Sequence, residues 1–133
     1  MASEPFEWAD LEAVAEGAKQ EALDNGWPMS IAIVDNGGHL RHLVRLDKAI
    51  APSATIATAK ARTSALYRLP SGALEGAAKE RPAMGMLPDA LALEGGMPIV
   101  IDGVVVGGIG VSGMQSDQDL QVAMAGLKVL ERR

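Results

Sequence analysis

The sequence predicts a small α/β domain of the α+β type, in which helices flank an antiparallel sheet. Strand-like runs surround the Asn-Gly-Gly segment at residues 36–38 and the Asp-Gly segment at residues 102–103, and both patterns are typical of β-hairpins. The chain of 133 residues has the usual length of one domain, which we assign to residues 1–133. The expected order is α-β-β-α-α-β-β-α, and a further strand-like stretch near Leu91 would make a sheet of about five strands.

The first half of the chain begins with an amphipathic helix. Its apolar residues recur at i, i+3, i+4, i+7 and i+11, which places them on one helical face. Asn25 and Gly26 end this helix, because both residue types tolerate the left-handed backbone of a C-cap. The first hairpin follows over residues 28–46. The predicted buried face of the first helix consists of Leu11, Val14, Ala15, Ala18 and Ala22.

The second half contains three further helices and the second hairpin. Pro52 suits the first turn of a helix over residues 53–67, and a short helix is expected over residues 73–80. Residues 81–88 contain two prolines, two methionines and a glycine, which predict a loop. The last helix is expected to start at Ser116, because the spacing from Ser116 to Asp119 resembles a capping box.

Composition excludes several classes of function. The net charge is −5 and the twelve basic residues are scattered, so a nucleic-acid partner is not expected. The absence of cysteine removes disulfides, thiolate metal sites and cysteine nucleophiles. No apolar run approaches the roughly 20 residues of a membrane span, and the acidic, amphipathic start lacks the features of a secretion signal. We therefore expect a cytoplasmic protein without a membrane partner.

A glycine-rich segment matches the dinucleotide-binding fingerprint G-x-G-x-x-G at Gly108, Gly110 and Gly113. That fingerprint belongs to a βαβ unit with an acidic residue at the end of the next strand, and no second parallel strand is expected after the last helix. We therefore predict a closely packed strand that ends in a turn. The amides that start at Ser112 precede a helix and could still hold an anionic group.

Several separate sequence blocks resemble those of the GlcG/HbpS family, which includes the C-terminal domain of PduO-type proteins and stand-alone haem-binding proteins. The similarity extends from Leu11 to Gly126, and its main blocks are residues 33–40, 45–49, 95–99 and 102–113. The resemblance implies a profilin-like α/β sandwich, a homo-oligomer and, in some members, haem binding or haem degradation. Lys48 departs from the family pattern, which often has glycine at this position.

One candidate site combines Arg45, Asp47, Ser53 and Lys60. The first two leave a strand on one face, and the last two lie on one stripe of the following helix. If the helix start folds over the strand end, the four side chains converge and could bind a carboxylate. The alternative is an Arg–Asp pair that only fixes the corner. Lys60 could also act as a Schiff-base amine or a general base if it is buried.

Further candidates are the two histidines and the segment that begins at Glu94. His39 lies on the polar face of its strand, whereas His42 shares a face with aliphatic residues and fits the core or an interface. Neither forms a metal-binding motif, so a permanent metal site is not expected. Glu94 with Gly95 and Gly96 could place a carboxylate and backbone amides at a pocket mouth, or form a plain loop.

Two functions from different classes remain open. The first is an oligomeric haem- or small-molecule-binding protein, with His39 or His42 as axial ligand and Arg45 or Lys60 pairing the propionates. The second is a cofactor-free lyase, isomerase or hydrolase for a small anionic metabolite, in which the candidate site and Glu94 orient the substrate and transfer a proton. In addition, the strand over residues 104–111 is apolar on both faces and would suit a buried subunit interface.

Overall fold

A computed structural model describes residues 6–132 of the chain. The element order agrees with the prediction, except that two short 3₁₀ helices are added. The elements are α1 (Trp8–Asp24), β1 (Ser30–Asp35), β2 (Leu40–Arg45), α2 (Pro52–Tyr67), α3 (Ser71–Glu80), η1 (Pro82–Met86), β3 (Gly96–Ile101), β4 (Val104–Ser112), α4 (Ser116–Lys128) and η2 (Val129–Arg132).

The sheet has four antiparallel strands in the order β2-β1-β4-β3. The antiparallel prediction is confirmed, but the expected fifth strand near Leu91 is absent from the described residues. The backbone there bonds to a helix instead, because the Leu91 amide donates to Thr63 Oγ1 on α2 at 2.8 Å. Apolar composition alone could not distinguish a strand from an extended segment held against a helix.

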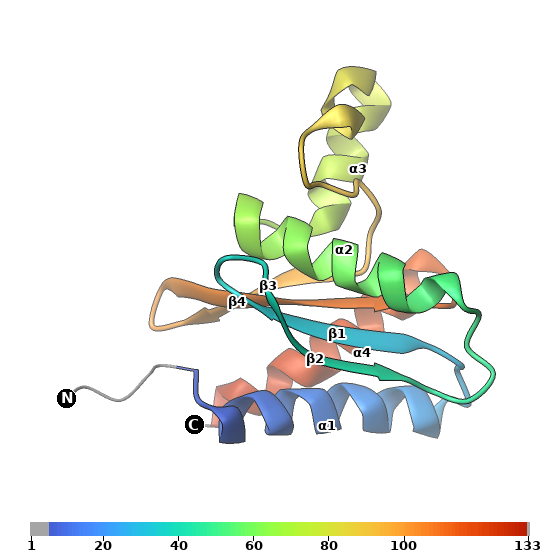
Figure 1. Ribbon diagram of the computed structural model, residues 1–133, viewed down its shortest axis with the longest axis vertical. Coiled ribbons are helices and arrows are strands. Elements are labelled where there is room, and N and C mark those ends of the chain that lie inside the picture. Colours follow the sequence, from blue (N-terminus) through green and yellow to red (C-terminus); the bar gives the residue numbers. More distant parts are fainter. Residues whose placement is uncertain (1–5, 133) are drawn as a thin grey trace.

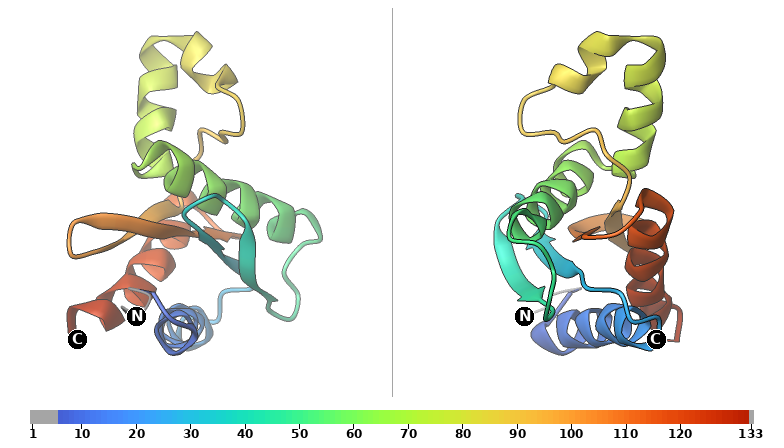
Figure 2. Two further views of the ribbon diagram at one scale, coloured as in Figure 1. Left: turned by 60° about the vertical axis from the view of Figure 1, so that its left-hand side comes forward. Right: turned by 90° about the vertical axis from the view of Figure 1, so that its right-hand side faces the viewer.

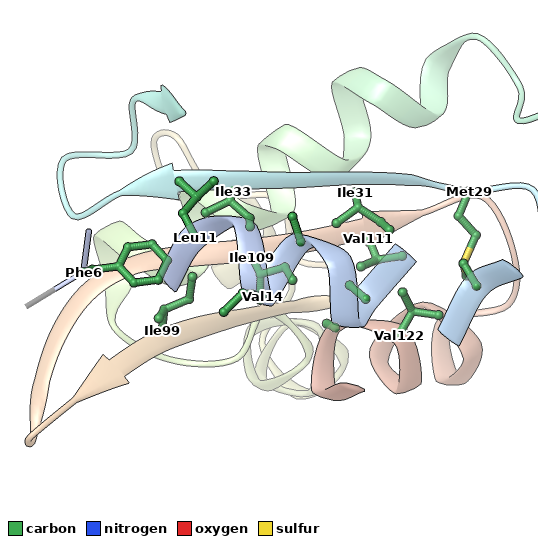
Figure 3. Packing of buried hydrophobic residues seen from close by; sticks show 14 residues of the cluster. Phe6, Leu11, Val14, Met29, Ile31, Ile33, Ile99, Ile109, Val111 and Val122 are labelled. Carbon is green, nitrogen blue, oxygen red and sulfur yellow. The ribbon is translucent and has the colours of Figure 1, made fainter. Parts of the chain in front are cut away.

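Helices cover both faces of the sheet, with α1 and α4 on one side and α2 on the other (Figures 1 and 2). Alternate residues of β1 therefore enter two separate cores. Ile31 and Ile33 face α1 and α4 in the larger core (Figure 3). Ala32 and Val34 face the smaller core under α2, which consists largely of alanine. No helix in the described part of the chain is both long and apolar enough to cross a membrane.

The glycine-rich segment lies in β4, as predicted, and explains how α2 approaches the sheet. A Cβ atom at Gly108 would collide with the carbonyl oxygen of Ala61, and one at Gly110 would collide with that of Ala57. Because the strand carries no side chains at these positions, the backbone of α2 packs directly on it. The dinucleotide fingerprint is therefore a helix-packing surface.

Four local predictions are corrected. The predicted loop over residues 81–88 contains η1, and α3 begins two residues before the expected start at residue 73. The cap of α4 is formed by Gln115 and Gln118 instead of Ser116 and Asp119. The strand over residues 104–111 is mostly buried within its own chain, because it is central in the sheet, so most of it is not available to a subunit interface.

The segment formed by α3 and η1 projects from the body of the molecule (Figures 1 and 2). Within α3 only Ser71 and Leu74 are buried, and Met86 at the end of η1 is 84% exposed. This projecting segment therefore adds little to the core of the described chain.

Candidate functional site

A buried ion pair joins α2 to α4 close to the end of β4. Lys60 Nζ donates to Asp119 Oδ2 at 3.1 Å and to the carbonyl oxygen of Val111 at 2.9 Å, and the side chains of Lys60 and Asp119 are each 4% exposed. The other carboxylate oxygen of Asp119 accepts from the Met114 amide at 3.1 Å. We call Lys60, Asp119 and Val111 the buried junction, because they connect three elements through one ammonium group.

Glycines close the buried junction to solvent. Gly95 has a φ of +129°, and a Cβ atom there would lie 2.7 Å from the Val111 carbonyl oxygen and 2.8 Å from Lys60 Nζ. The neighbouring Gly96 amide donates to Ser71 Oγ at 2.8 Å. The predicted site residues Lys60, Gly95 and Gly96 do meet, but their surroundings are filled by protein atoms and leave no space for a substrate.

Two opposing effects act on the pKa of Asp119 in the buried junction. Burial raises the pKa of Asp119 above its ordinary value of 3.8, while the charge and hydrogen bond of Lys60 act in the opposite direction. The Lys60 ammonium in turn has its donors directed at Asp119 and at a carbonyl. An amine held in this way is not accessible for Schiff-base or general-base chemistry, so the geometry does not favour those two alternatives for Lys60.

The predicted cluster of four residues is not assembled. Ser53 Oγ lies 2.8 Å from Ser30 Oγ and donates to the Ile50 carbonyl at 2.6 Å, so this hydroxyl fixes the start of α2 to β1. Arg45 and Asp47 are exposed, and within residues 6–132 no hydrogen bond or ion pair joins Arg45, Asp47, Ser53 or Lys60 to another of the four. The alternative of an Arg45–Asp47 pair is likewise not observed among the described ion pairs.

Arg45 and Asp47 line an open cleft beside the C-terminal end of α1. The cleft has a volume of about 320 Å³, and Trp27, Leu46 and Lys48 also contribute to its wall. Lys48 has a φ of 70°, a left-handed conformation that costs a residue with a Cβ atom roughly 1–2 kcal/mol. Lys48 thus replaces the glycine of the family pattern at a position whose backbone has the conformation that glycine adopts most easily.

Glu94 and Ser112 lie apart from this cleft. The Glu94 amide donates to Glu75 Oε1 of α3 at 2.8 Å, and the Glu94 side chain packs beside Gly72, near the start of α3. Ser112 is buried at the end of β4. The amides expected to hold an anion are in part already occupied, because the Gln115 amide donates to Gln118 Oε1 at 3.2 Å, and the Met114 amide is bound by Asp119.

Both imidazoles lie in or beside β2. His42 is half-buried and packs edge-on against Trp8 of α1, with 6.4 Å between ring centroids. His39 is exposed in the hairpin turn, where Asp35 Oδ1 accepts from the amides of Gly37 and His39 at 2.9 and 3.0 Å. No hydrogen bond to either ring is found in the described chain, so each imidazole retains its capacity to bind a ligand.

Protein side chains alone do not form a metal centre in residues 6–132, because no three histidine, cysteine or acidic groups gather there. A haem differs from a bare metal ion, because the porphyrin supplies four ligands and one protein side chain can complete the coordination. The imidazoles of His39 and His42 and the guanidinium of Arg45 have no hydrogen-bond or ion-pair partner among residues 6–132, and these groups are therefore compatible with haem.

Comparison with known proteins assigns the family. The model of the family described as "Haem degrading protein HbpS-like" matches residues 6–128. The chain belongs to the HbpS-like family. Protein GlcG of Escherichia coli K12 is 41% identical over 101 residues, which cover 75% of each chain. An uncharacterised 15.0 kDa protein from the dhaT–dhaS intergenic region of Citrobacter freundii is 27% identical over 124 residues, covering 90% of this chain and 87% of that protein.

Solved structures of HbpS-like proteins show the same fold. A double mutant of Streptomyces reticuli HbpS superposes with a TM-score of 0.89 at 33% identity, covering 98% of this chain and 90% of that one. The PduOC–haem complex superposes with a TM-score of 0.85 at 23% identity, covering 92% and 93% of the two chains. At this identity the PduOC likeness shows the fold alone, and the family assignment supports a haem-related function.

Proposed function

We propose that this chain binds haem, with a histidine of the first hairpin as an axial ligand of the iron. The observation that carries the proposal is the pair of imidazoles, His39 and His42, whose ring nitrogens are free of hydrogen bonds in the described structure. Histidine is a common haem ligand, and the HbpS-like assignment makes a haem-related role the expected one.

Arg45 is a better candidate than Lys60 to form an ion pair with a haem propionate. The Lys60 ammonium is buried and already bound to Asp119, whereas Arg45 is exposed and has no acidic partner among the described residues. A guanidinium can hold a carboxylate with two parallel hydrogen bonds. When bound, haem supplies an iron centre for electron transfer or oxygen chemistry, and the chain supplies the ligand, the counter-ion and the apolar surface.

Titration with hemin tests this proposal. Purified protein should give a saturable, sharpened Soret band, and this change should weaken in one of the two single variants, His39→Ala and His42→Ala, and in the double variant. Asn36→Ala, an exposed change in the same turn, is a matched control that should bind as the wild type. The proposal fails if the wild type gives no saturable change, or if the double variant retains it in full.

We further propose that the protein is a single-domain, cytoplasmic homo-oligomer. Large apolar side chains are exposed away from the cores, including Val100 and Val104 beside the β3–β4 turn and Met86 on the projecting segment. Apolar surface of this kind supports a subunit contact. Sedimentation at micromolar protein concentration should show a dimer or larger species, and a monomer would contradict this part of the proposal.

A second candidate function is a cofactor-free enzyme for a small anionic metabolite. The open cleft supports it, because Arg45 and Lys48 supply positive charge, Asp47 a carboxylate and Trp27 an aromatic surface. Benzoate is a minimal probe for the binding half of this function: it should raise the melting temperature of the wild type and have less effect on Lys48→Gln. Lys128→Gln on α4 is the control, and no shift in the wild type would reject this candidate.

A further inference from the structure

The open cleft beside the C-terminal end of α1 contains charges of both signs that the described chain does not neutralise. Arg45, Asp47 and Lys48 line this cleft. None of their three side chains takes part in an ion pair or a hydrogen bond within residues 6–132, whereas Lys60 and other lysines are paired with acidic groups. The charged groups of the cleft are therefore available to a ligand.

Backbone hydrogen bonds hold both walls of the cleft in place. On the α1 side, the Trp27 amide donates to the Ala22 carbonyl at 2.9 Å. On the other side, the Leu46 amide donates to the Met29 carbonyl at 2.9 Å, and the amide of the buried Ala49 closes a turn by donating to the Leu46 carbonyl at 3.1 Å. Because the walls are fixed before a ligand arrives, little ordering is required on binding.

The turn that carries Lys48 is strained at the cleft. Its φ of 70° lies in the left-handed region, where a residue with a Cβ atom is less stable than glycine. Strained residues of this kind concentrate at ligand sites, where the surrounding structure imposes the conformation. The strain therefore supports a ligand-binding role for the ammonium group of Lys48.

Opposite charges and an apolar surface meet in the cleft. The C-terminal end of a helix carries partial negative charge, the last turn of α1 has no basic side chain, and Asp47 adds a full negative charge. Arg45 and Lys48 supply the positive charge, and Trp27 and Leu46 supply apolar surface. A simple carboxylate would leave Asp47 without a cation, and a simple amine would leave both cations without an anion.

We infer that this cleft binds a free α-amino acid with an aromatic side chain. Its carboxylate pairs with Arg45 and Lys48, its ammonium group with Asp47, and its ring packs against Trp27. The inference rests on the carboxylate binding proposed above for this cleft and names the rest of the ligand. The cleft volume of about 320 Å³ is at the lower end for small-molecule sites, which suits a single amino acid.

Three ligands that share a phenyl ring test the assignment. L-Phenylalanine has both charged groups, hydrocinnamate lacks the amine and phenethylamine lacks the carboxylate. The chain has two tryptophans, so in a Trp8→Phe background the fluorescence of Trp27 reports binding in the cleft. L-Phenylalanine should bind roughly two- to fivefold more tightly than either of the other two, which is the effect of one exposed ion pair.

Charge-removing variants should change the three affinities in opposite directions. Asp47→Asn should weaken L-phenylalanine and phenethylamine, and strengthen hydrocinnamate, by roughly two- to fivefold each. Lys48→Gln should weaken L-phenylalanine and hydrocinnamate, and strengthen phenethylamine, by similar factors. A purely structural role of either side chain would instead shift all three ligands in the same direction and would overturn the inference.

Matched controls make the same chemical changes at exposed positions away from the cleft. Asp102→Asn at the β3–β4 turn and Lys128→Gln on α4 should bind all three ligands as the Trp8→Phe parent does. Circular dichroism should show that every variant is folded. Glycine, which has both charged groups but no ring, should bind much more weakly than L-phenylalanine, and equal binding would overturn the aromatic part of the assignment.

The outcomes separate the inference from the carboxylate binding on which it rests. If hydrocinnamate binds as tightly as L-phenylalanine and Asp47→Asn affects neither, the amino acid assignment is overturned and carboxylate binding stands. If phenethylamine binds as tightly as L-phenylalanine and Lys48→Gln affects neither, both are overturned. If the protein binds none of the three, both are likewise rejected, and the proposal of haem binding is unaffected.

Discussion

Lys60 and Arg45 are basic residues that the sequence groups in one site, yet their surroundings are opposite. Lys60 is 4% exposed at its side chain and bound to Asp119, whereas Arg45 is exposed with no acidic partner in the described chain. A buried, paired charge positions structural elements, and an exposed, unpaired one is available to a ligand. Charged residues that share a strand or helix face therefore cannot be assigned to one functional site before the partner of each charge is known.

The largest effect on the free energy of unfolding is expected from Lys60→Met, at the buried member of the pair Lys60 and Arg45. The change leaves the Asp119 carboxylate buried without its counter-ion, which typically costs about 3–5 kcal/mol. Urea unfolding followed by circular dichroism measures the free energy of unfolding. Lys79→Met on α3 is the matched control, because that side chain is 76% exposed, and it should change stability by no more than about 0.5 kcal/mol. A loss below about 1 kcal/mol in Lys60→Met would show that the buried junction is not structural.

Gly95→Ala tests how tightly the buried junction is packed. The new Cβ atom would approach the Val111 carbonyl oxygen and Lys60 Nζ, in addition to the strain of a positive φ. Gly103→Ala is the control, since Gly103 also has a positive φ, of +77°, but nothing lies within 4 Å of its Cβ position. We expect Gly95→Ala to cost about 1–3 kcal/mol more than Gly103→Ala in the same unfolding measurement. Equal costs would mean that backbone strain alone matters.

Much of the fold could be predicted because its signals are local. The turn at residues 36–38 and the one at residues 102–103 each identify a hairpin from adjacent residues, and the apolar stripe of α1 is contained in one helix. The buried junction could not be predicted in this way. Its two charges are 59 residues apart in sequence, and only the packing of α4 beside β4 brings them together.

The Lys60–Asp119 pair was missed, although a signal for it was available in the sequence. Lys60 lies on the buried stripe of an alanine-rich helix, and a lysine at such a position requires an acidic partner. Asp119 was interpreted as a helix cap, because capping and pairing use the same residue type at the same place.

A graded effect of pH is expected at the buried junction. An acid whose pKa is raised on folding destabilises the protein once it ionises, so stability falls as pH rises from the ordinary value of 3.8 through the raised pKa of Asp119. The free energy of unfolding of the wild type, relative to Asp119→Asn, should therefore decrease as the pH rises above the ordinary value of 3.8 and through the raised pKa of Asp119. The same difference for Asp102→Asn, at the exposed β3–β4 turn, is the control. An increase would mean that attraction to Lys60 outweighs burial.

The smallest effect is expected in the open cleft that Arg45 and Lys48 line. There Lys48→Gly should raise the free energy of unfolding by about 0.5 kcal/mol. Glycine adopts the φ of 70° found at Lys48 without a Cβ penalty, and part of this gain is offset by the greater freedom of the unfolded chain. Lys128→Gly in α4 is a control of opposite sign, because glycine in a helix costs up to about 1 kcal/mol. A Lys48→Gly variant that is more stable than the wild type and yet no longer shows the rise in melting temperature with benzoate is one informative result. That result would show that the Lys48 side chain contributes to ligand binding while its positive φ lowers the stability of the fold. A variant that loses stability would instead show that the Lys48 side chain stabilises the cleft itself.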